Sequence, residues 1–365
     1  LTDRVDRISA VYRFVEQNIK YLGIEFGIGA YRPRPAESTL AQGQGDCKDM
    51  TALMVALLRA LNIDAYPALV RPSDQGIFVV EHPAPGQFSH VLLYVPHAHG
   101  DYWIDATAGL GTLNTIPEVL RGQLALIVDG QGGRLLRIPV ARAQENRFLE
   151  TQTYQLTETG GGKLTSNISL TGYLAGQVRQ RLLSFDSTAR TAILSSPGYI
   201  LGRTFIPDTV HLQDLDTPSE PVRITSSLKD KDLVSVRLDG SLMVTPNLDA
   251  LGTGLLSAAG GGLAIDSSRV VIREMTIILP DSYTFDWSPL NIQMEGAISL
   301  RVSERRVSGQ TTITTRLEFP SRPKTPGEMT ALNTAFKSIR ERLSKQLIML
   351  PGEGFDRIHF LNAIT

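Results

Sequence analysis

Cysteine is nearly absent from this chain: one residue, Cys47, occurs among 365. A single cysteine cannot form a disulfide within the chain, and it cannot supply a zinc cluster built on cysteine ligands. A lone thiol fits a reducing compartment, and it also fits an exported enzyme that keeps one reactive cysteine. The cysteine count therefore directs attention to the chemistry around Cys47.

Long apolar runs and an excess of charge are missing as well. No apolar stretch approaches the roughly 18 residues that a transmembrane helix needs, so no transmembrane segment is expected. The formal net charge is -1 and no basic run occurs, which excludes an electrostatic footprint for nucleic acid. The chain opens on Leu1-Thr2-Asp3-Arg4, without an initiator methionine or a signal peptide, and we expect it to be an excised fragment.

What the chain does contain is an ordinary globular composition, with 42% hydrophobic and 20% charged residues. This length predicts two or three domains. Apolar residues recur every three or four positions over residues 5–20 and again from Cys47 onward, which predicts two amphipathic helices, the second ending near Asn62. The glycine- and proline-rich stretch 23–35 between them predicts a loop. Buried strands are predicted for three short apolar runs, at residues 65–70, 91–95 and 102–104.

The character of the sequence changes after residues 130–133, which we interpret as a linker. Alternating apolar residues then predict strands around 154–156, 168–170, 234–238 and 313–319. Helices are predicted at 176–194 and 326–350, and a loop at 252–262. The predicted class is therefore α+β. In a first domain, at 1–135, helices pack on a small antiparallel sheet. A mainly β region follows at 145–365 and ends in a helix. It contains one or two domains, and a β-sandwich is one architecture that would fit.

The chemistry of the first domain centres on the segment GDCKD at 45–49. Cys47 stands where a glycine-containing loop enters a strongly patterned helix. A helix N-terminus carries partial positive charge and unpaired N–H groups, which favour a thiolate and could hold an oxyanion. Asp46 suits the N-cap, Lys48 a solvated position in the first turn, and Asp49 the helix dipole. These features make Cys47 a candidate nucleophile.

A histidine and a carboxylate are placed to assist Cys47. His90 opens the strand-like run HVLLYV, so its ring is predicted to project from a rigid support and to act as the base. Asp105 follows the next predicted strand, and adjacent strands would bring it beside His90. A carboxylate there fixes the histidine tautomer and stabilises the imidazolium. The sequence thus predicts a Cys47–His90–Asp105 site.

The motifs around these residues resemble those of the transglutaminase-like superfamily, which includes transglutaminases, peptide N-glycanases and bacterial cysteine-protease-like proteins. The matching segments are YRPRP at 31–35, GDCKD at 45–49, ALLRAL at 56–61, FSHV at 88–91 and IDAT at 104–107. The last segment has Ala106 where the common form has proline, a departure that leaves the carboxylate untouched. The resemblance covers residues 5–130 and implies a papain/transglutaminase-like core. It also implies a bacterial periplasmic or cell-envelope location for the full-length protein.

Further site residues are expected from papain-like chemistry, which needs a second oxyanion donor. Gln42, Gln44 and Tyr31 precede the cysteine and could supply one. Tyr31, Trp103 and Phe88 could line the substrate cleft, or they could belong to the core. His97, His99 and Asp101 are better explained as a loop than as a metal site, and no calcium-loop spacing occurs. We predict no metal and no cofactor.

Two functions remain open on the sequence alone. The first is acyl transfer or amide and peptide hydrolysis through a thioester on Cys47, with a peptide or protein as the substrate. The second is a catalytically silent peptide-binding or assembly module whose β-rich region docks a partner along an exposed sheet edge. Arylamine acetyltransferase chemistry would need a coenzyme A site, and no basic, glycine-rich phosphate cradle is present.

Overall fold

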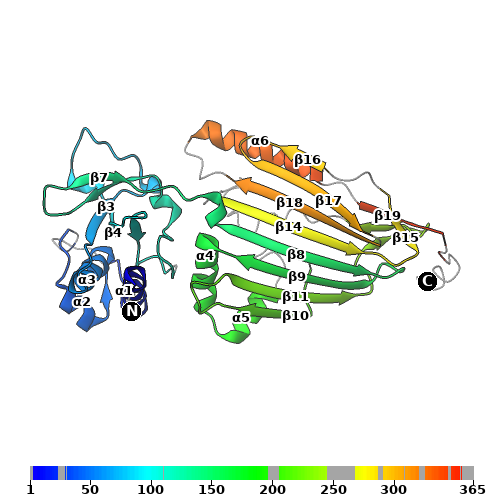
Figure 1. Cartoon of the computed structure of the whole chain (residues 1–365), viewed down its shortest axis with the longest axis horizontal. Coiled ribbons are helices and arrows are strands. Elements are labelled where there is room, and N and C mark those ends of the chain that lie inside the picture. Colours follow the sequence, from blue (N-terminus) through cyan, green and yellow to red (C-terminus); the bar gives the residue numbers. More distant parts are fainter. Residues whose placement is uncertain are drawn as a thin grey trace. The chain divides into compact units, whose positions relative to one another are not determined.

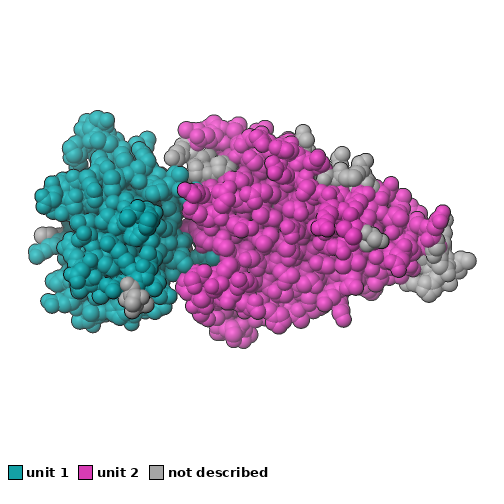
Figure 2. All heavy atoms as spheres, in the orientation of Figure 1, with its two compact units in different colours: residues 1–141, 175–180 teal, residues 142–174, 181–365 magenta. Residues whose placement is uncertain are grey.

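A computed structural model of the chain describes residues 3–23, 29, 31–109, 111–195, 205–244, 268–286, 291–307, 309–319, 325–343, 347–353 and 355. Two compact units divide the chain: residues 1–141 with 175–180, and residues 142–174 with 181–365 (Figure 2). The predicted loop at 252–262 lies outside the described residues, and so does part of the loop at 23–35. The predicted α+β class is confirmed by helices and large sheets in one chain.

The first unit is built of three helices and a five-stranded antiparallel sheet (Figure 1). The helices are α1 (Arg4–Asn18), α2 (Ala36–Gln42) and α3 (Cys47–Ala60). The sheet has the order β5-β4-β3-β6-β7, with strands β3 (Tyr66–Val70), β4 (His90–Val95), β5 (Tyr102–Ile104), β6 (Leu124–Ile127) and β7 (Arg134–Arg137). A two-stranded parallel pair, β1 (Lys20–Tyr21) with β2 (Gln44–Gly45), precedes α3. The predicted helices at 5–20 and after Cys47 and the three predicted strands are confirmed.

Two apolar cores lie on the two faces of this sheet. The first joins α1 and α3 to Leu93 and Val95 of β4. The second contains the alternate residues Leu92 and Tyr94 of β4 together with side chains of β3 and β6. Because successive side chains of a strand point to opposite faces, this division follows from the pleat of β4. Residues 92–95 of β4 are therefore buried on both faces of the sheet, which makes this strand a rigid support for His90 at its start.

In the first unit one helix was not predicted, one local prediction is confirmed and one is wrong. Helix α2 was not predicted, because seven residues without apolar periodicity give no pattern; it ends at Gly43, whose left-handed φ of 62° suits a C-cap. Asn62, predicted to end α3, does adopt a left-handed φ of 57° just beyond it. The predicted linker at 130–133 is instead the turn of the β6–β7 hairpin, where three glycines have positive φ.

The second unit is dominated by an eight-stranded sheet of order β10-β11-β9-β8-β14-β18-β17-β16 (Figure 1). Its strands are β8 (Arg147–Leu156), β9 (Gly162–Leu170), β10 (Thr209–Gln213), β11 (Val222–Asp230), β14 (Arg269–Ile278), β16 (Asn291–Met294), β17 (Ser299–Val307) and β18 (Gln310–Phe319). The β8–β14 pair is parallel and the other pairs are antiparallel. The alternation predicted for β18 is confirmed, since every second residue from Thr311 to Phe319 is buried.

A four-stranded sheet of order β12-β13-β19-β15 completes the second unit. Its strands are β12 (Ser235–Val236), β13 (Leu242–Val244), β15 (Tyr283–Phe285) and β19 (Leu347–Pro351). The helices described after residue 141 are α4 (Gly172–Leu183), whose residues 175–180 belong to the first unit, α5 (Ser187–Ser195) and α6 (Pro326–Leu343). The helical interruption predicted at 176–194 is confirmed. The predicted helix at 326–350 is too long, because Leu347 and Met349 alternate on a strand between β13 and β15. The predicted common face of 234–238 is also wrong, since Leu238 is exposed.

Candidate active site

Cys47 is the first residue of α3, and the cap of this helix is fully formed. Asp46 Oδ1 accepts from the N–H groups of Lys48 at 3.1 Å and Asp49 at 3.2 Å, while Asp49 Oδ2 accepts from the N–H of Asp46 at 3.2 Å. This reciprocal arrangement is a capping box, and the predicted N-cap at Asp46 is confirmed. The sulfur therefore starts from a fixed helix N-terminus, where the helix dipole favours negative charge. The amides of Lys48 and Asp49 both donate to the Asp46 carboxylate and are not the unpaired N–H groups expected from the sequence.

The turn before Cys47 has too little space for a side chain at Gly45. A Cβ at Gly45 would lie 2.8 Å from the Cβ of Asp49 and 3.2 Å from Cγ2 of Thr39. Gly45 also pairs with Tyr21 in the short parallel ladder. The glycine thus permits a close approach between the entering chain and the first turn of α3.

Arg34 holds the first turn of α3 from outside the helix. Its main-chain N–H donates to Asp49 Oδ1 at 2.7 Å, and its Nε and Nη2 donate to Asp49 Oδ2 at 2.9 and 2.7 Å. Burial raises the pKa of Asp49, but the bonds from Arg34 and from the Asp46 amide outweigh it and hold this pKa below its usual range. The conformation at Cys47 is therefore anchored by an ionised carboxylate.

Lys48 departs from the solvated position predicted for it. Its side chain is only 8% exposed, and its Nζ lies 2.5 Å from Asp46 Oδ2. The sequence pattern could not show this, because the carboxylate that pairs with Lys48 is the same one that caps the helix. The pair keeps a buried cation one residue from the thiol.

His90 is the first residue of β4, and Asp105 follows β5, the neighbouring antiparallel strand. His90 Nε2 lies 2.9 Å from Asp105 Oδ2. The other carboxylate oxygen, Oδ1, accepts from the N–H of Thr107 at 3.0 Å and from its hydroxyl at 2.7 Å. Both oxygens of the buried Asp105 are thus engaged, which fixes the plane of the carboxylate and the direction in which it holds the imidazole.

Cys47 hydrogen-bonds the His90 side chain, so the structure brings the three residues predicted from the sequence into one line. Burial lowers the pKa of His90, but the hydrogen bonds and negative charges of Asp105 and Cys47 raise it overall to about 10. Burial likewise raises the pKa of Asp105, and the bonds from His90 and Thr107 reverse this and hold it below its usual range. A positively charged imidazole beside a sulfur atom stabilises negative charge on that sulfur, as a nucleophile needs.

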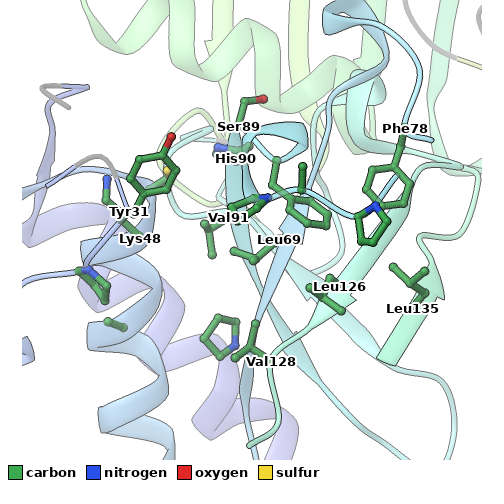
Figure 3. A pocket seen from close by; sticks show the side chains of 18 of the residues that line it. Tyr31, Lys48, Leu69, Phe78, Ser89, His90, Val91, Leu126, Val128 and Leu135 are labelled. Carbon is green, nitrogen blue, oxygen red and sulfur yellow. The ribbon is translucent and has the colours of Figure 1, made fainter. Parts of the chain in front are cut away.

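The line of residues opens on a cavity of about 750 Å³ (Figure 3). In the figure, Tyr31 and Lys48 border one side of this cavity, while Phe78, Leu126 and Leu135 border the opposite side. Cys47 and His90 both line it. The cavity therefore gives a substrate a place directly beside the thiol.

The other residues predicted for the site fall in different places. Tyr31 and Phe88 line the cavity. Trp103 is buried in the apolar core beside Tyr94, with ring centroids 5.0 Å apart, and is not among the described cavity-lining residues.

The two glutamines also lie away from the cavity lining. The Oε1 of Gln42 accepts from Nη1 of Arg34, and the main-chain oxygen of Gln44 accepts from Nη2 of Arg34 at 2.9 Å. Sequence reasoning missed the apolar wall formed by Phe78, Val80 and Val128. The apolar run IFVV at 77–80 inside a glycine- and proline-rich loop was the available signal.

The loop after β4 carries the two histidines and the aspartate that were weighed against a metal site in the sequence, His97, His99 and Asp101. Asp101 accepts from the hydroxyl of Tyr94 at 2.8 Å and from the N–H of His97 at 3.1 Å, and the His97 and His99 rings lie 5.6 Å apart. Within the described ranges, no group of three or more histidine, cysteine, aspartate or glutamate side chains is arranged to hold a metal. Across the same ranges, no helix is long and apolar enough to cross a membrane.

Comparison with known proteins gives one family match and one similar fold. Residues 1–106 match the family model of the transglutaminase-like superfamily, which confirms the resemblance seen in the motifs. The fold is similar to a crystal structure of "a putative protease" from Parabacteroides distasonis, with a TM-score of 0.53 and 10% sequence identity over 94% of this chain. The chain spans about half of that structure, 51% of its length. No curated protein sequence matches the chain.

Proposed function

We propose that residues 1–135 form a thiol-dependent catalytic core that hydrolyses amide or peptide bonds or transfers the acyl group. Cys47 is the nucleophile, His90 the proton carrier and Asp105 the residue that orients His90. The observation that carries this proposal is the ordered contact from the thiol through His90 to the buried carboxylate, with His90 Nε2 2.9 Å from Asp105 Oδ2, at the edge of a cavity. The match to the transglutaminase-like superfamily supports it.

The proposed reaction has two halves. In the first, His90 holds the proton of the thiol while the sulfur of Cys47 attacks the amide carbon, and a C–S bond forms as the C–N bond breaks. His90 gives its proton to the departing amine, leaving a thioester. In the second, water or an amine attacks the thioester carbon, its proton passes to His90, and the C–S bond breaks. Water gives hydrolysis, and an amine gives transfer.

The oxyanion that forms in each half needs hydrogen-bond donors. Among the predicted donors, Tyr31 is the residue that lines the cavity, and we propose its hydroxyl as a donor to the oxyanion. Gln42 and Gln44 lie at Arg34 and away from the cavity lining, so we assign them to the Arg34 contact instead. Tyr31→Phe removes only the hydroxyl, and we expect it to lower the rate of acylation more than the affinity for substrate.

The pH dependence of thiol alkylation tests the proposal before any substrate is known. Iodoacetamide labelling of Cys47, followed by mass spectrometry, is expected to stay fast below pH 7 in the parent chain. It is expected to slow, or to move to higher pH, in His90→Ala. Slow labelling in both proteins, with a pH midpoint near the ordinary cysteine pKa of ~8.5, would contradict an activated thiol.

A second candidate function is favoured by the low exposure of Cys47, which is 4%. A thiol so covered fits a catalytically silent module in which the cavity binds a peptide without turnover. The exposed edges of the eight-stranded sheet, β10 and β16, would then offer places for a partner strand. Failure of Cys47 to react with iodoacetamide, together with peptide binding by the intact chain, would favour this function.

Location in the bacterial periplasm or cell envelope remains a proposal that rests on the family resemblance. Fractionation of bacterial cells that express the full-length protein tests it. Recovery in the cytosolic fraction would contradict it.

A further inference from the structure

The cavity beside the thiol is apolar over most of its lining. Its polar or titratable side chains, Tyr31, Cys47, Lys48, Ser89 and His90, are few beside an apolar majority. We call the part bounded by Leu69, Phe78, Val80, Leu126, Val128 and Leu135 the apolar chamber. Of the lysine, arginine, aspartate and glutamate side chains that the structure describes, only Lys48 reaches the cavity, and it is paired with Asp46.

One wall of the chamber, with Phe78 and Val80, belongs to the loop of residues 71–89, and side chains of this loop hold it in place. Gln87 bonds both main-chain groups of Val79: its Oε1 accepts from the N–H at 2.8 Å, and its Nε2 donates to the oxygen at 2.9 Å. Arg71 donates to the main-chain oxygens of Gln75 at 2.9 Å and Gln87 at 3.2 Å. The side-chain amide of Gln87 thus makes with Val79 the two hydrogen bonds that a neighbouring strand would otherwise make.

Aromatic packing adds to this support. The rings of Phe78 and Phe88 lie 5.1 Å apart, and both residues line the cavity. A wall fixed by side-chain bonds and ring contacts can bind a ligand without first being ordered, which lowers the entropic cost of binding.

Several side chains of the chamber face water. Val80 is 49% exposed, Val128 43% and Leu135 39%. Grouped apolar exposure costs free energy in the unliganded chain, and it is typical of surfaces that a ligand covers. Since the chamber continues directly to Cys47 and His90, the ligand that covers it is the one presented to the thiol.

We propose that the apolar chamber is the acyl-side specificity pocket of the site, and that it binds a large apolar side chain, such as leucine or phenylalanine, of a peptide substrate. This inference rests on the proposed function. The acyl side is chosen because the acyl group stays bonded to sulfur through both halves of the reaction and must be held throughout, whereas the amine leaves after the first half. A glutamine or charged side chain would lose water in the chamber without gaining enough polar partners, so the pocket selects against it.

Affinity labels that carry a single amino-acid side chain test this inference on the intact chain. N-acetyl aminoacyl chloromethyl ketones of leucine, phenylalanine, glycine, glutamine and aspartate alkylate a thiolate as the C–S bond forms and chloride leaves. The rate of Cys47 labelling by each, measured by mass spectrometry, is divided by the iodoacetamide rate of the same protein. We expect leucine and phenylalanine labels to react about ten- to a hundredfold faster than the glycine label, and the glutamine and aspartate labels to show no such gain.

Two substitutions and a matched control locate the effect. Val128→Asp places a charge in the chamber at a half-exposed position, and Phe78→Ala removes part of the wall. Both are expected to lower the leucine-to-glycine ratio about tenfold or more. Val140→Asp makes the same change at an exposed valine outside the cavity lining and is expected to leave the ratio unchanged.

The outcomes separate the inference from the proposed function. Fast iodoacetamide labelling with a leucine-to-glycine ratio near one, or an unchanged ratio in Val128→Asp, would overturn the specificity pocket and leave the activated thiol standing. Slow iodoacetamide labelling in the parent would overturn the proposed function and the inference with it.

Discussion

His90 Nε2 lies 2.9 Å from Asp105 Oδ2, while Oδ1 of the same carboxylate is held by Thr107. The carboxylate therefore accepts from His90 on one oxygen only, and the histidine keeps Nδ1 for the thiol. This one-sided arrangement sets the tautomer of the ring and makes Asp105 the residue whose charge the site depends on.

Replacing Asp105 with asparagine keeps the size of the side chain but removes its charge. An amide group can present a donor to Nε2, which disfavours the tautomer and the imidazolium that the carboxylate stabilises. We expect Asp105→Asn to slow iodoacetamide labelling of Cys47 at pH 6.5 about ten- to a hundredfold. Asp101→Asn is the matched control, because Asp101 bonds Tyr94 and His97 instead. Equal effects of the two variants would contradict the assigned role.

The stability of the first unit should depend on pH through His90. Burial lowers the pKa of His90, but Asp105 and Cys47 raise it to about 10 in the folded chain, above its ordinary value of 6.5. Since the folded state holds the proton more tightly, the stabilising contribution is full below about pH 6.5 and is lost as pH rises through about 10. We expect His90→Gln to abolish this alkaline decline.

Urea titrations of parent and His90→Gln across pH 6–11 measure this dependence. Pulse proteolysis with mass spectrometry of peptides from β4 and β5 reports the unfolding of the first unit separately from the second. The same alkaline decline in both proteins would show that another group is responsible.

The contact of Arg34 with Asp49 should stabilise the start of α3. Arg34→Ala removes the two side-chain bonds from Nε and Nη2 to Asp49 Oδ2 and keeps the main-chain bond to Oδ1, so the buried carboxylate is left with fewer partners and without its cation. Its cost is expected to be about 1–3 kcal/mol of unfolding free energy, together with slower labelling of Cys47. Asp49 has a lowered pKa, so this contribution is present above the ordinary aspartate pKa of 3.8 and is lost as pH falls below it.

Chemical denaturation and labelling of Arg34→Ala are compared with Arg32→Ala, which removes an exposed arginine from the same segment. If both variants lose the same stability, the loss belongs to the segment and not to the contact with Asp49.

A buried ion pair in the second unit offers a test of the large sheet. Arg273 Nε donates to Glu150 Oε2 at 2.8 Å, and Glu150 Oε1 accepts from Ser166 and Gln152 at 2.8 Å each. Glu150 on β8 and Arg273 on β14 are partners in the parallel register. Arg273→Met is expected to cost about 3–5 kcal/mol, because it leaves a buried carboxylate without its cation.

The double variant Glu150→Met/Arg273→Met removes both charges and is expected to regain most of that loss. Denaturation of the two single variants and the double variant forms a double-mutant cycle. Additive losses would show that the two side chains do not act as a pair in the folded sheet.

The spacing of apolar residues predicted the secondary structure correctly where one face of a single helix or strand is buried. Val11 and Val15 recur on the buried face of α1, and β18 alternates because one of its faces is covered. The prediction was wrong where local pattern competes with distant pairing. Leu347 continues a helical period from α6 in the sequence, but hydrogen bonding to β13 and β15 places it on a strand.

The features of the site likewise fall into those that follow from neighbours in sequence and those that depend on the fold. Asp46 as N-cap could be predicted because capping is a contact between neighbours in sequence. The burial of Lys48 could not be predicted, since a first-turn lysine is usually solvated and only the folded surroundings cover it. The places of Trp103 in the core and Phe78 at the cavity depend on which loop crosses which face of the sheet.

The sequence by itself determined the helix start at Cys47, the strand that carries His90 and the position of Asp105 at the end of the next strand, because each follows from local periodicity, capping and motif. The tertiary structure alone decided that Arg34 anchors Asp49, that Lys48 is buried, and that the loop at 71–89 and the β6–β7 hairpin wall an apolar chamber beside the thiol. These contacts join residues far apart in the chain, and the packing that creates them leaves no period in the sequence.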